Sequence, residues 1–125
     1  MAATTILVID DSEPERGVVR KLLELEGYAV CAAASGDEGL AQFRERQPAL
    51  VLCDLMLPGR SGFDTVRAIR AHNPDACIVA VSGTLFGVAE HETMIKRLGL
   101  AGVVEKPFRP AKLLEIVLRA LQAGR

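Results

Sequence analysis

The sequence lacks the features that mark membrane, secreted or nucleic-acid-binding proteins. Its formal net charge is -1, and it has neither a basic run nor an acidic tail. We therefore expect no direct DNA binding, and partners recognised through a local surface. No apolar run approaches the roughly 18 residues that a membrane span needs, and the N-terminus has no basic region before a long apolar core. These absences predict a cytoplasmic protein without membrane attachment.

Cysteines are also few. The chain has only Cys31, Cys53 and Cys77, which are widely spaced and lie in apolar surroundings. An odd number with such spacing favours reduced core thiols over disulfides or a zinc site.

The 125 residues fit one domain, 1–125, with a core from about 5 to 122. Short apolar runs alternate with stretches of helical apolar spacing. The runs predict strands at 5–9, 28–33, 50–53, 77–81 and 102–105. A helix is expected after each strand, although the start of the fourth, between Gly87 and Glu92, is poorly marked. This alternation predicts an α/β fold with an open parallel sheet covered by helices on both faces.

Two of the expected helices begin with the same local signal. Ser12 with Glu15, and Ser35 with Glu38, have the spacing of a capping box, in which each side chain bonds the other residue's backbone N–H. Gly27 is placed to end the first helix.

Polar side chains stand where four of the five strands end. Asp10 and Asp11 follow the first strand, Asp54 the third, Ser82 the fourth and Lys106 the fifth. Ligands bind outside the carboxyl ends of strands in open α/β sheets, so this edge is the candidate site. Mg²⁺ prefers carboxylate oxygens, and a lysine adds a second positive charge. The set suits phosphoryl transfer with one carboxylate as nucleophile.

Each of these residues also has an ordinary structural interpretation. An Asp pair after a strand commonly caps a helix, a Ser followed by Gly commonly forms a turn, and a Lys commonly ends a strand in solvent. Their coincidence at the ends of four strands is what favours a site.

At these residues the chain resembles the receiver domains of two-component response regulators, over nearly its whole length. Four motifs carry the resemblance: Val8-Ile9-Asp10-Asp11, Asp54 to Gly59 with Ser61-Gly62-Phe63, Val81-Ser82-Gly83, and Glu105-Lys106-Pro107-Phe108. The resemblance implies a flavodoxin-like, doubly wound sheet of five parallel strands in the order 2-1-3-4-5, with five helices.

The resemblance also implies roles for single residues. Asp54 is the implied phosphoacceptor, and Ser82 and Lys106 contact the phosphoryl oxygens. Mg²⁺ is implied to bind Asp11 directly with Asp10 assisting, together with Asp54 and the backbone carbonyl of Met56. The bond before Pro107 is implied to be cis.

The implied partners are a histidine kinase or phosphotransfer protein as donor and a downstream protein as target. We expect a monomer or a weak dimer. The chain would not be an enzyme with a separate substrate, but would assist its own phosphorylation and dephosphorylation.

Two stretches depart from the family pattern. Val103 stands three residues before the lysine, where most members carry a Tyr or Phe that swings inward on activation. Phe86 is the one nearby aromatic that we nominate to replace that ring, although packing on the fourth helix is the more ordinary role. The segment 100–103 replaces an Asp-Asp-Tyr run, which disfavours dimerisation through charged pairs.

Three hypotheses remain open. The first is a phosphoacceptor signalling domain, and the second is a receiver-fold adaptor regulated by binding alone, motivated by Val103. The third is a Mg²⁺-dependent phosphatase with an Asp nucleophile. Such an enzyme normally needs a second acid two residues after its nucleophile, where this chain has Met56. His72 and His91 are single and separated, so we expect surface positions.

Overall fold

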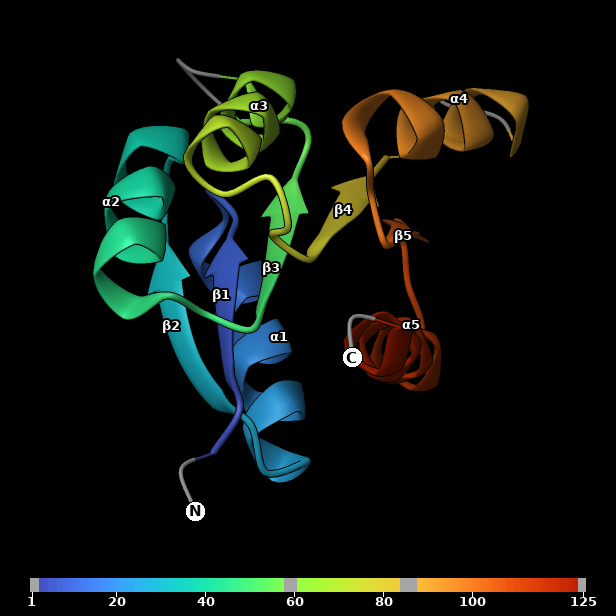
Figure 1. The fold of residues 1–125 in the computed structure, drawn as a ribbon. Helices are drawn as coiled ribbons and strands as arrows, with labels where there is room; N and C mark the ends of the chain where they lie inside the picture. The colour runs from blue at the N-terminus through green and yellow to red at the C-terminus, as the bar shows by residue number, and fades with distance from the viewer. Residues whose placement is uncertain (1–2, 58–60, 84–87, 124–125) are drawn as a thin grey trace.

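The computed structural model describes residues 3–57, 61–83 and 88–123, without the side chains of Val88 and His91 (Figure 1). The nominated Phe86 lies outside the described residues. Strands and helices alternate along the chain. The strands are Thr5–Ile9 (β1), Ala29–Ala33 (β2), Leu50–Asp54 (β3), Ile78–Ser82 (β4) and Gly102–Glu105 (β5). The helices are Glu13–Leu25 (α1), Gly36–Arg46 (α2), Gly62–His72 (α3), Val88–Leu98 (α4) and Pro110–Ala123 (α5).

The strands form one parallel sheet in the order β2-β1-β3-β4-β5. This confirms the predicted fold class and strand order. β3 is buried along its whole length, as expected for an apolar run in the middle of a sheet that is covered on both faces.

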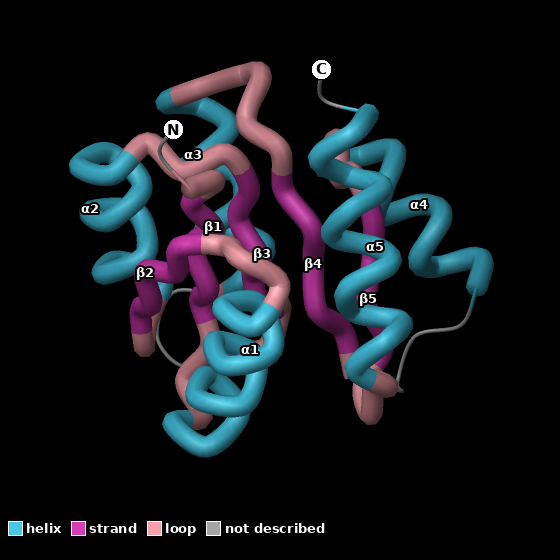
Figure 2. The backbone as a smooth tube through the Cα atoms, turned by 90° about the horizontal axis from the view of Figure 1, so that it is seen from below, coloured by secondary structure: helices cyan, strands magenta, loops and turns pink. Residues whose placement is uncertain are grey.

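Helices cover both faces of the sheet. Alternate residues of each strand point to opposite faces. Leu7, Val51 and Ile78 pack on one face with α2, α3 and α4, whereas Ile6 and Leu50 pack on the other with α1 and α5. Figure 2 shows α1 and α5 together in front of the strands. The sheet edge that carries the site is thus held by two hydrophobic cores.

Serine side chains begin three of the helices. The hydroxyls of Ser12, Ser35 and Ser61 accept hydrogen bonds from backbone N–H groups at the third helical position. In α2 the Glu38 carboxylate accepts from the N–H of Ala34 at 3.3 Å, one residue before the Ser35 N–H that the capping box predicted. Gly27 has φ of +91°, which confirms that it ends α1 in a conformation that favours glycine.

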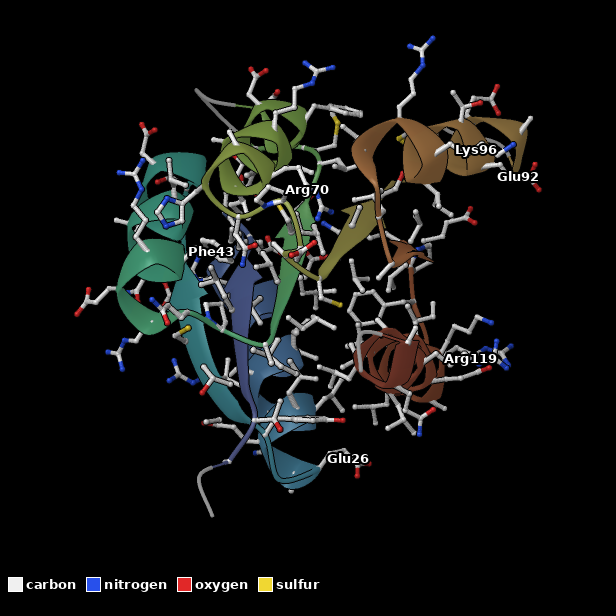
Figure 3. The ribbon with its side chains drawn as sticks, viewed as in Figure 1. Glu26, Phe43, Arg70, Glu92, Lys96 and Arg119 are labelled. Carbon is white, nitrogen blue, oxygen red and sulfur yellow. The ribbon has the colours of Figure 1, made fainter. Side chains whose placement is uncertain are left out.

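Arg70, labelled in Figure 3, ties α3 to the end of α4. Its guanidinium donates to the carbonyls of Pro74 and Ala76 at 2.8 and 2.6 Å. It also donates to the carbonyls of Leu98 and Gly99 at 3.4 and 2.7 Å. A cation at these carbonyls satisfies acceptors that the C-terminus of α4 leaves open.

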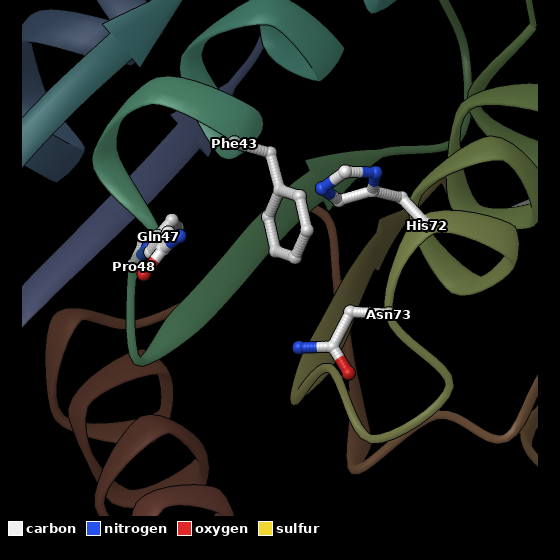
Figure 4. A pocket seen from close by; sticks show the side chains of 5 residues that line it. All are labelled: Phe43, Gln47, Pro48, His72 and Asn73. Carbon is white, nitrogen blue, oxygen red and sulfur yellow. The ribbon is translucent and has the colours of Figure 1, made fainter.

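The C-terminal turns of α2 and α3 meet at the edge of the sheet where the strands begin, opposite the carboxyl ends that carry the candidate site. The rings of Phe43 and His72 make an edge-to-face contact with centroids 5.9 Å apart, beside a pocket that Gln47, Pro48 and Asn73 also line (Figure 4). His72 is exposed, which confirms its expected surface position.

All three cysteines are free thiols: two are buried and Cys77 is half-buried. Burial raises the pKa of Cys53 to about 12, so its thiol stays protonated at neutral pH. The expectation of reduced thiols packed into the fold is confirmed. In the part of the chain that the structure describes, no helix has both the length and the apolar character of a membrane span.

Candidate functional site

Strand register brings the predicted site residues to one edge of the sheet. Asp54, the last residue of β3, pairs with Val81, and the next residue of β4, Ser82, pairs with Glu105. The backbone N–H of Lys106 then donates to the carbonyl of Ser82 at 2.7 Å. The ends of three neighbouring strands therefore present their polar side chains together, as predicted from the sequence.

Asp54 is held by both of its carboxylate oxygens. The side chain is buried, with 2% of the residue's surface exposed. Its Oδ1 accepts from the backbone N–H of Met56 at 2.8 Å, and its Oδ2 accepts from Nζ of Lys106 at 2.7 Å. These two contacts fix the orientation of the carboxylate at the mouth of the site.

Lys106 is shared between two acids. Besides Asp54, its ammonium donates to Oε2 of Glu15 at 2.8 Å. Burial lowers the pKa of Lys106, but the hydrogen bonds to the two carboxylates outweigh burial and raise it above its ordinary value. The side chain is therefore a permanent cation at the site. The peptide bond between Lys106 and Pro107 is cis, as the resemblance implied.

Asp10 follows β1 directly and is also buried. Burial, together with a hydrogen bond to the Glu15 carboxyl, raises the pKa of Asp10 from 3.8 to about 7, although the N–H of Ser12 donates to its Oδ1 at 2.9 Å. For Glu15, burial raises the pKa, but the hydrogen bonds from Lys106 and Asp10 prevail and lower it. The state in which Asp10 and Glu15 are both ionised is thus disfavoured.

Carboxylate oxygens of Asp10, Glu15 and Asp54 lie within 4.8 Å of one another, and these three residues are the acid group of the site. An all-oxygen set whose members repel one another fits a hard divalent cation such as Mg²⁺. Receiver domains bind Mg²⁺ at an acidic pocket of this kind. The acid group therefore has the chemistry that the implied cofactor needs.

The remaining predicted site residues lie at the same edge without joining this group. Asp11 is exposed and is not one of the three acids. The Ser82 hydroxyl is fully buried and donates to the carbonyl of Gly83 at 3.2 Å. Met56 contributes its backbone N–H to Asp54, and its side chain is exposed. Val103 is half-buried and packs on the face that α2, α3 and α4 cover.

Glu15 is the site residue that sequence reasoning missed. Half of its predicted capping box forms, because its N–H donates to the Ser12 hydroxyl at 3.3 Å. The other half does not form as expected: the Ser12 N–H is taken by Asp10, and the Glu15 carboxylate turns to Lys106. The available signal was that the first turn of α1 starts at the same edge of the sheet as Lys106, which directly follows β5.

Comparisons with known proteins agree with this geometry. A model of the response regulator receiver domain family matches residues 6–118. A receiver domain protein from Methanospirillum hungatei is similar over 98% of this chain and 97% of its own, with 28% identity and a TM-score of 0.89. The chemotaxis protein CheY of Halobacterium salinarum is 29% identical over 97% of this chain and 99% of its own length.

Other relatives are longer than this chain. The phosphate regulon transcriptional regulatory protein PhoB of Pseudomonas aeruginosa is 32% identical over 99% of this chain, which spans 56% of that protein. The chain spans 27% of the nitrogen assimilation regulatory protein NtrX of Azorhizobium caulinodans, with 33% identity. Because relatives include a protein named DNA-binding response regulator MtrA, the expected lack of DNA binding stays a prediction.

Proposed function

We propose that this chain, which belongs to the response regulator receiver domain family, carries a two-component signal by accepting a phosphoryl group on Asp54. The observation that carries this assignment is the buried Asp54 carboxylate, held between the Met56 N–H and the Lys106 ammonium beside two further acids. A nucleophile, a fixed cation and a cation-binding acid group together suit phosphoryl transfer.

The donor in this proposal is a phosphohistidine on a histidine kinase or phosphotransfer protein. A carboxylate oxygen of Asp54 attacks phosphorus and forms an O–P bond, while the P–N bond breaks and its electron pair returns to the imidazole nitrogen. Lys106 faces the charge that develops on the transferred oxygens. The Ser82 hydroxyl, one residue beyond the register partner of Asp54, would leave the Gly83 carbonyl to bond the phosphoryl group.

Asp10 and Asp54 would hold Mg²⁺, with Asp11 and the Met56 carbonyl added by resemblance to the family. When bound, the ion would offset the charge of the acid group and of the phosphoryl oxygens. Binding of Mg²⁺ would be accompanied by the loss of a proton from Asp10, because the pKa of this carboxyl is raised to about 7.

The signal would then reach a downstream protein through a change in which surfaces this domain presents. The binding-only adaptor remains the second candidate because Val103 replaces the usual aromatic, and an aliphatic side chain packed against the sheet face has no ring to swing. The phosphatase hypothesis receives no support from Met56, whose side chain is exposed and carries no acid.

The proposal is tested by adding Mg²⁺ and beryllofluoride, a stable phosphoryl mimic, and recording amide NMR shifts. We expect shifts at Asp54, Met56, Ser82 and Lys106 in the unmodified chain. Asp54→Asn should remove them, whereas Asp75→Asn, an exposed control in the loop before β4, should not.

The extent of the shifts separates the two candidates. Shifts that spread to α4, β5 and α5 would support a working switch, and shifts confined to the site would favour relay or adaptor use. Beryllofluoride-dependent shifts that survive in Asp54→Asn would place the acceptor elsewhere, and no shifts in the unmodified chain would leave only the adaptor.

A further inference from the structure

Glu15 reaches the phosphoacceptor site from a different element than the other acids. It lies in the first turn of α1, and its side chain keeps 33% of its surface exposed while its Oε2 meets the Lys106 ammonium at 2.8 Å. The same ammonium meets Asp54 at 2.7 Å. One cation therefore serves two carboxylates, one from the first turn of α1 and one from the end of β3.

A phosphoryl group on Asp54 would change this balance. It replaces the single charge of the carboxylate with a group carrying nearly two negative charges and three acceptor oxygens. An oxygen of Glu15 lies within 4.8 Å of an oxygen of Asp54, so the phosphoryl oxygens would lie close to the negative charge of the Glu15 carboxylate. Like charges at this separation in a partly buried site repel strongly.

We propose that Glu15 competes with the phosphoryl group for Lys106 and repels it, so that this residue weakens anion binding at Asp54 while strengthening binding of the divalent cation. The inference rests on the proposed phosphorylation of Asp54. Glu15 is a positioning residue in this account, because it acts through Lys106 and through its charge on the acid group. The two effects have opposite signs because one ligand is an anion and the other a cation.

If Glu15 only stabilised the helix, the expected effects of substituting it would be different. An acid in the first turn of a helix stabilises the helix through its dipole, whatever binds nearby. Glu13 provides the matched control, because it is an exposed acid in the same first turn and is not a member of the acid group. A purely helical role predicts similar effects from Glu13→Gln and Glu15→Gln.

The experiment compares the unmodified chain with these two variants. Binding of Mg²⁺ alone is followed by amide NMR shifts, and beryllofluoride is then titrated at saturating Mg²⁺. For Glu15→Gln we expect Mg²⁺ affinity to fall about threefold to tenfold and beryllofluoride affinity to rise about tenfold. Glu13→Gln should leave both affinities within about twofold. Thermal unfolding of each variant checks that the fold is kept, and Glu15→Met replaces Glu15→Gln if the amide disturbs the helix.

The outcomes separate this inference from the proposed function. If the unmodified chain binds beryllofluoride and Glu15→Gln binds it no more tightly, the inference is wrong and the function stands. A rise in Mg²⁺ affinity in Glu15→Gln would overturn it as well. If neither the chain nor the variant binds beryllofluoride, the proposed function fails and the inference fails with it. Binding seen only in the variant would support the repulsion by Glu15 and would contradict the proposed function of the unmodified chain.

Discussion

The ammonium of Lys106 donates a hydrogen bond to Oδ2 of Asp54 across 2.7 Å, although the two residues stand 52 positions apart. The contact depends on β4, which lies between β3, where Asp54 is the last residue, and β5, which Lys106 directly follows. The backbone of Lys106 is anchored separately, through its N–H on the Ser82 carbonyl. The cation is therefore placed by the sheet itself and not by a flexible loop.

Lys106→Met should weaken beryllofluoride binding by about tenfold or more, because a partly buried ion pair with the phosphoryl mimic is lost and Asp54 faces Glu15 without the cation between them. Some phosphoryl acceptance should remain, since Asp54 is intact. Lys112→Met is the control: this lysine is exposed and lies 4.0 Å from Glu115. Equal beryllofluoride titration midpoints for the two variants would mean that Lys106 does not contribute to phosphoryl binding.

Arg70→Gln should lower the free energy of unfolding by about 1–3 kcal/mol, because carbonyls in the loop before β4 and just after α4 lose their charged donor. Arg67→Gln serves as the comparison, since Arg67 is largely exposed and its contact with Asp64 measures 3.7 Å. Urea denaturation gives both values. A loss no greater than that of Arg67→Gln would mean that water replaces the guanidinium without cost.

Gly62→Ala and Gly17→Ala should change stability in opposite directions. A Cβ on Gly62 would collide with the carbonyl oxygen of Asp54 and with Cα of Leu55, which are backbone atoms that cannot turn aside. We expect a loss of about 1–3 kcal/mol. A Cβ on Gly17 meets no atom within 4 Å, so Ala should stabilise α1 by about 0.5–1 kcal/mol. Denaturant midpoints that move the same way would contradict the close approach at Gly62.

The raised pKa of Asp10 should lower the stability of the metal-free protein as the pH rises from about 4 to about 7. The folded-state pKa of Asp10 is raised from 3.8 to about 7, because burial and the Glu15 carboxyl favour its protonated form. Between these values the folded state holds a proton that the unfolded state has released, so unfolding becomes easier with rising pH. The contribution is on the order of a few kcal/mol.

Asp10→Asn should flatten that pH profile, because a neutral amide has no proton to lose. Asp75→Asn, which removes an exposed carboxyl in the loop before β4, is the charge-matched comparison and should keep the slope of the unmodified chain. Thermal unfolding across this pH range in a chelating buffer measures both. A profile for Asp10→Asn as steep as that of the unmodified chain would assign the pH dependence to another group.

The fold was predictable because its signals are local. Apolar runs that stop at Asp10, Asp54 and Ser82 marked the strand ends within one or two residues, and the alternation of elements required a parallel sheet. The start of α4 was not predictable in the same way. It begins at Val88, and the sequence from Gly87 to Glu92 has no Ser, Thr, Asp or Asn that would mark a helix start.

The site was predictable only in part. Residues at strand ends are brought together by topology, which a resemblance to a family supplies. Glu15 was missed because a local motif offered its carboxylate a nearer partner, the N–H of Ser12, and that donor is taken by Asp10. The contact that forms instead joins residues 91 positions apart. No short-range pattern carries information about such a pair.

The central claim is that Asp54 is the phosphoacceptor, and intact-mass measurement after incubation with Mg²⁺ and a small phosphodonor tests it most directly. The account predicts that the unmodified chain gains the mass of one phosphoryl group and that Asp54→Asn gains none while remaining folded. An equal mass gain in Asp54→Asn would contradict the claim, and so would the absence of any gain in the unmodified chain once Mg²⁺ is bound.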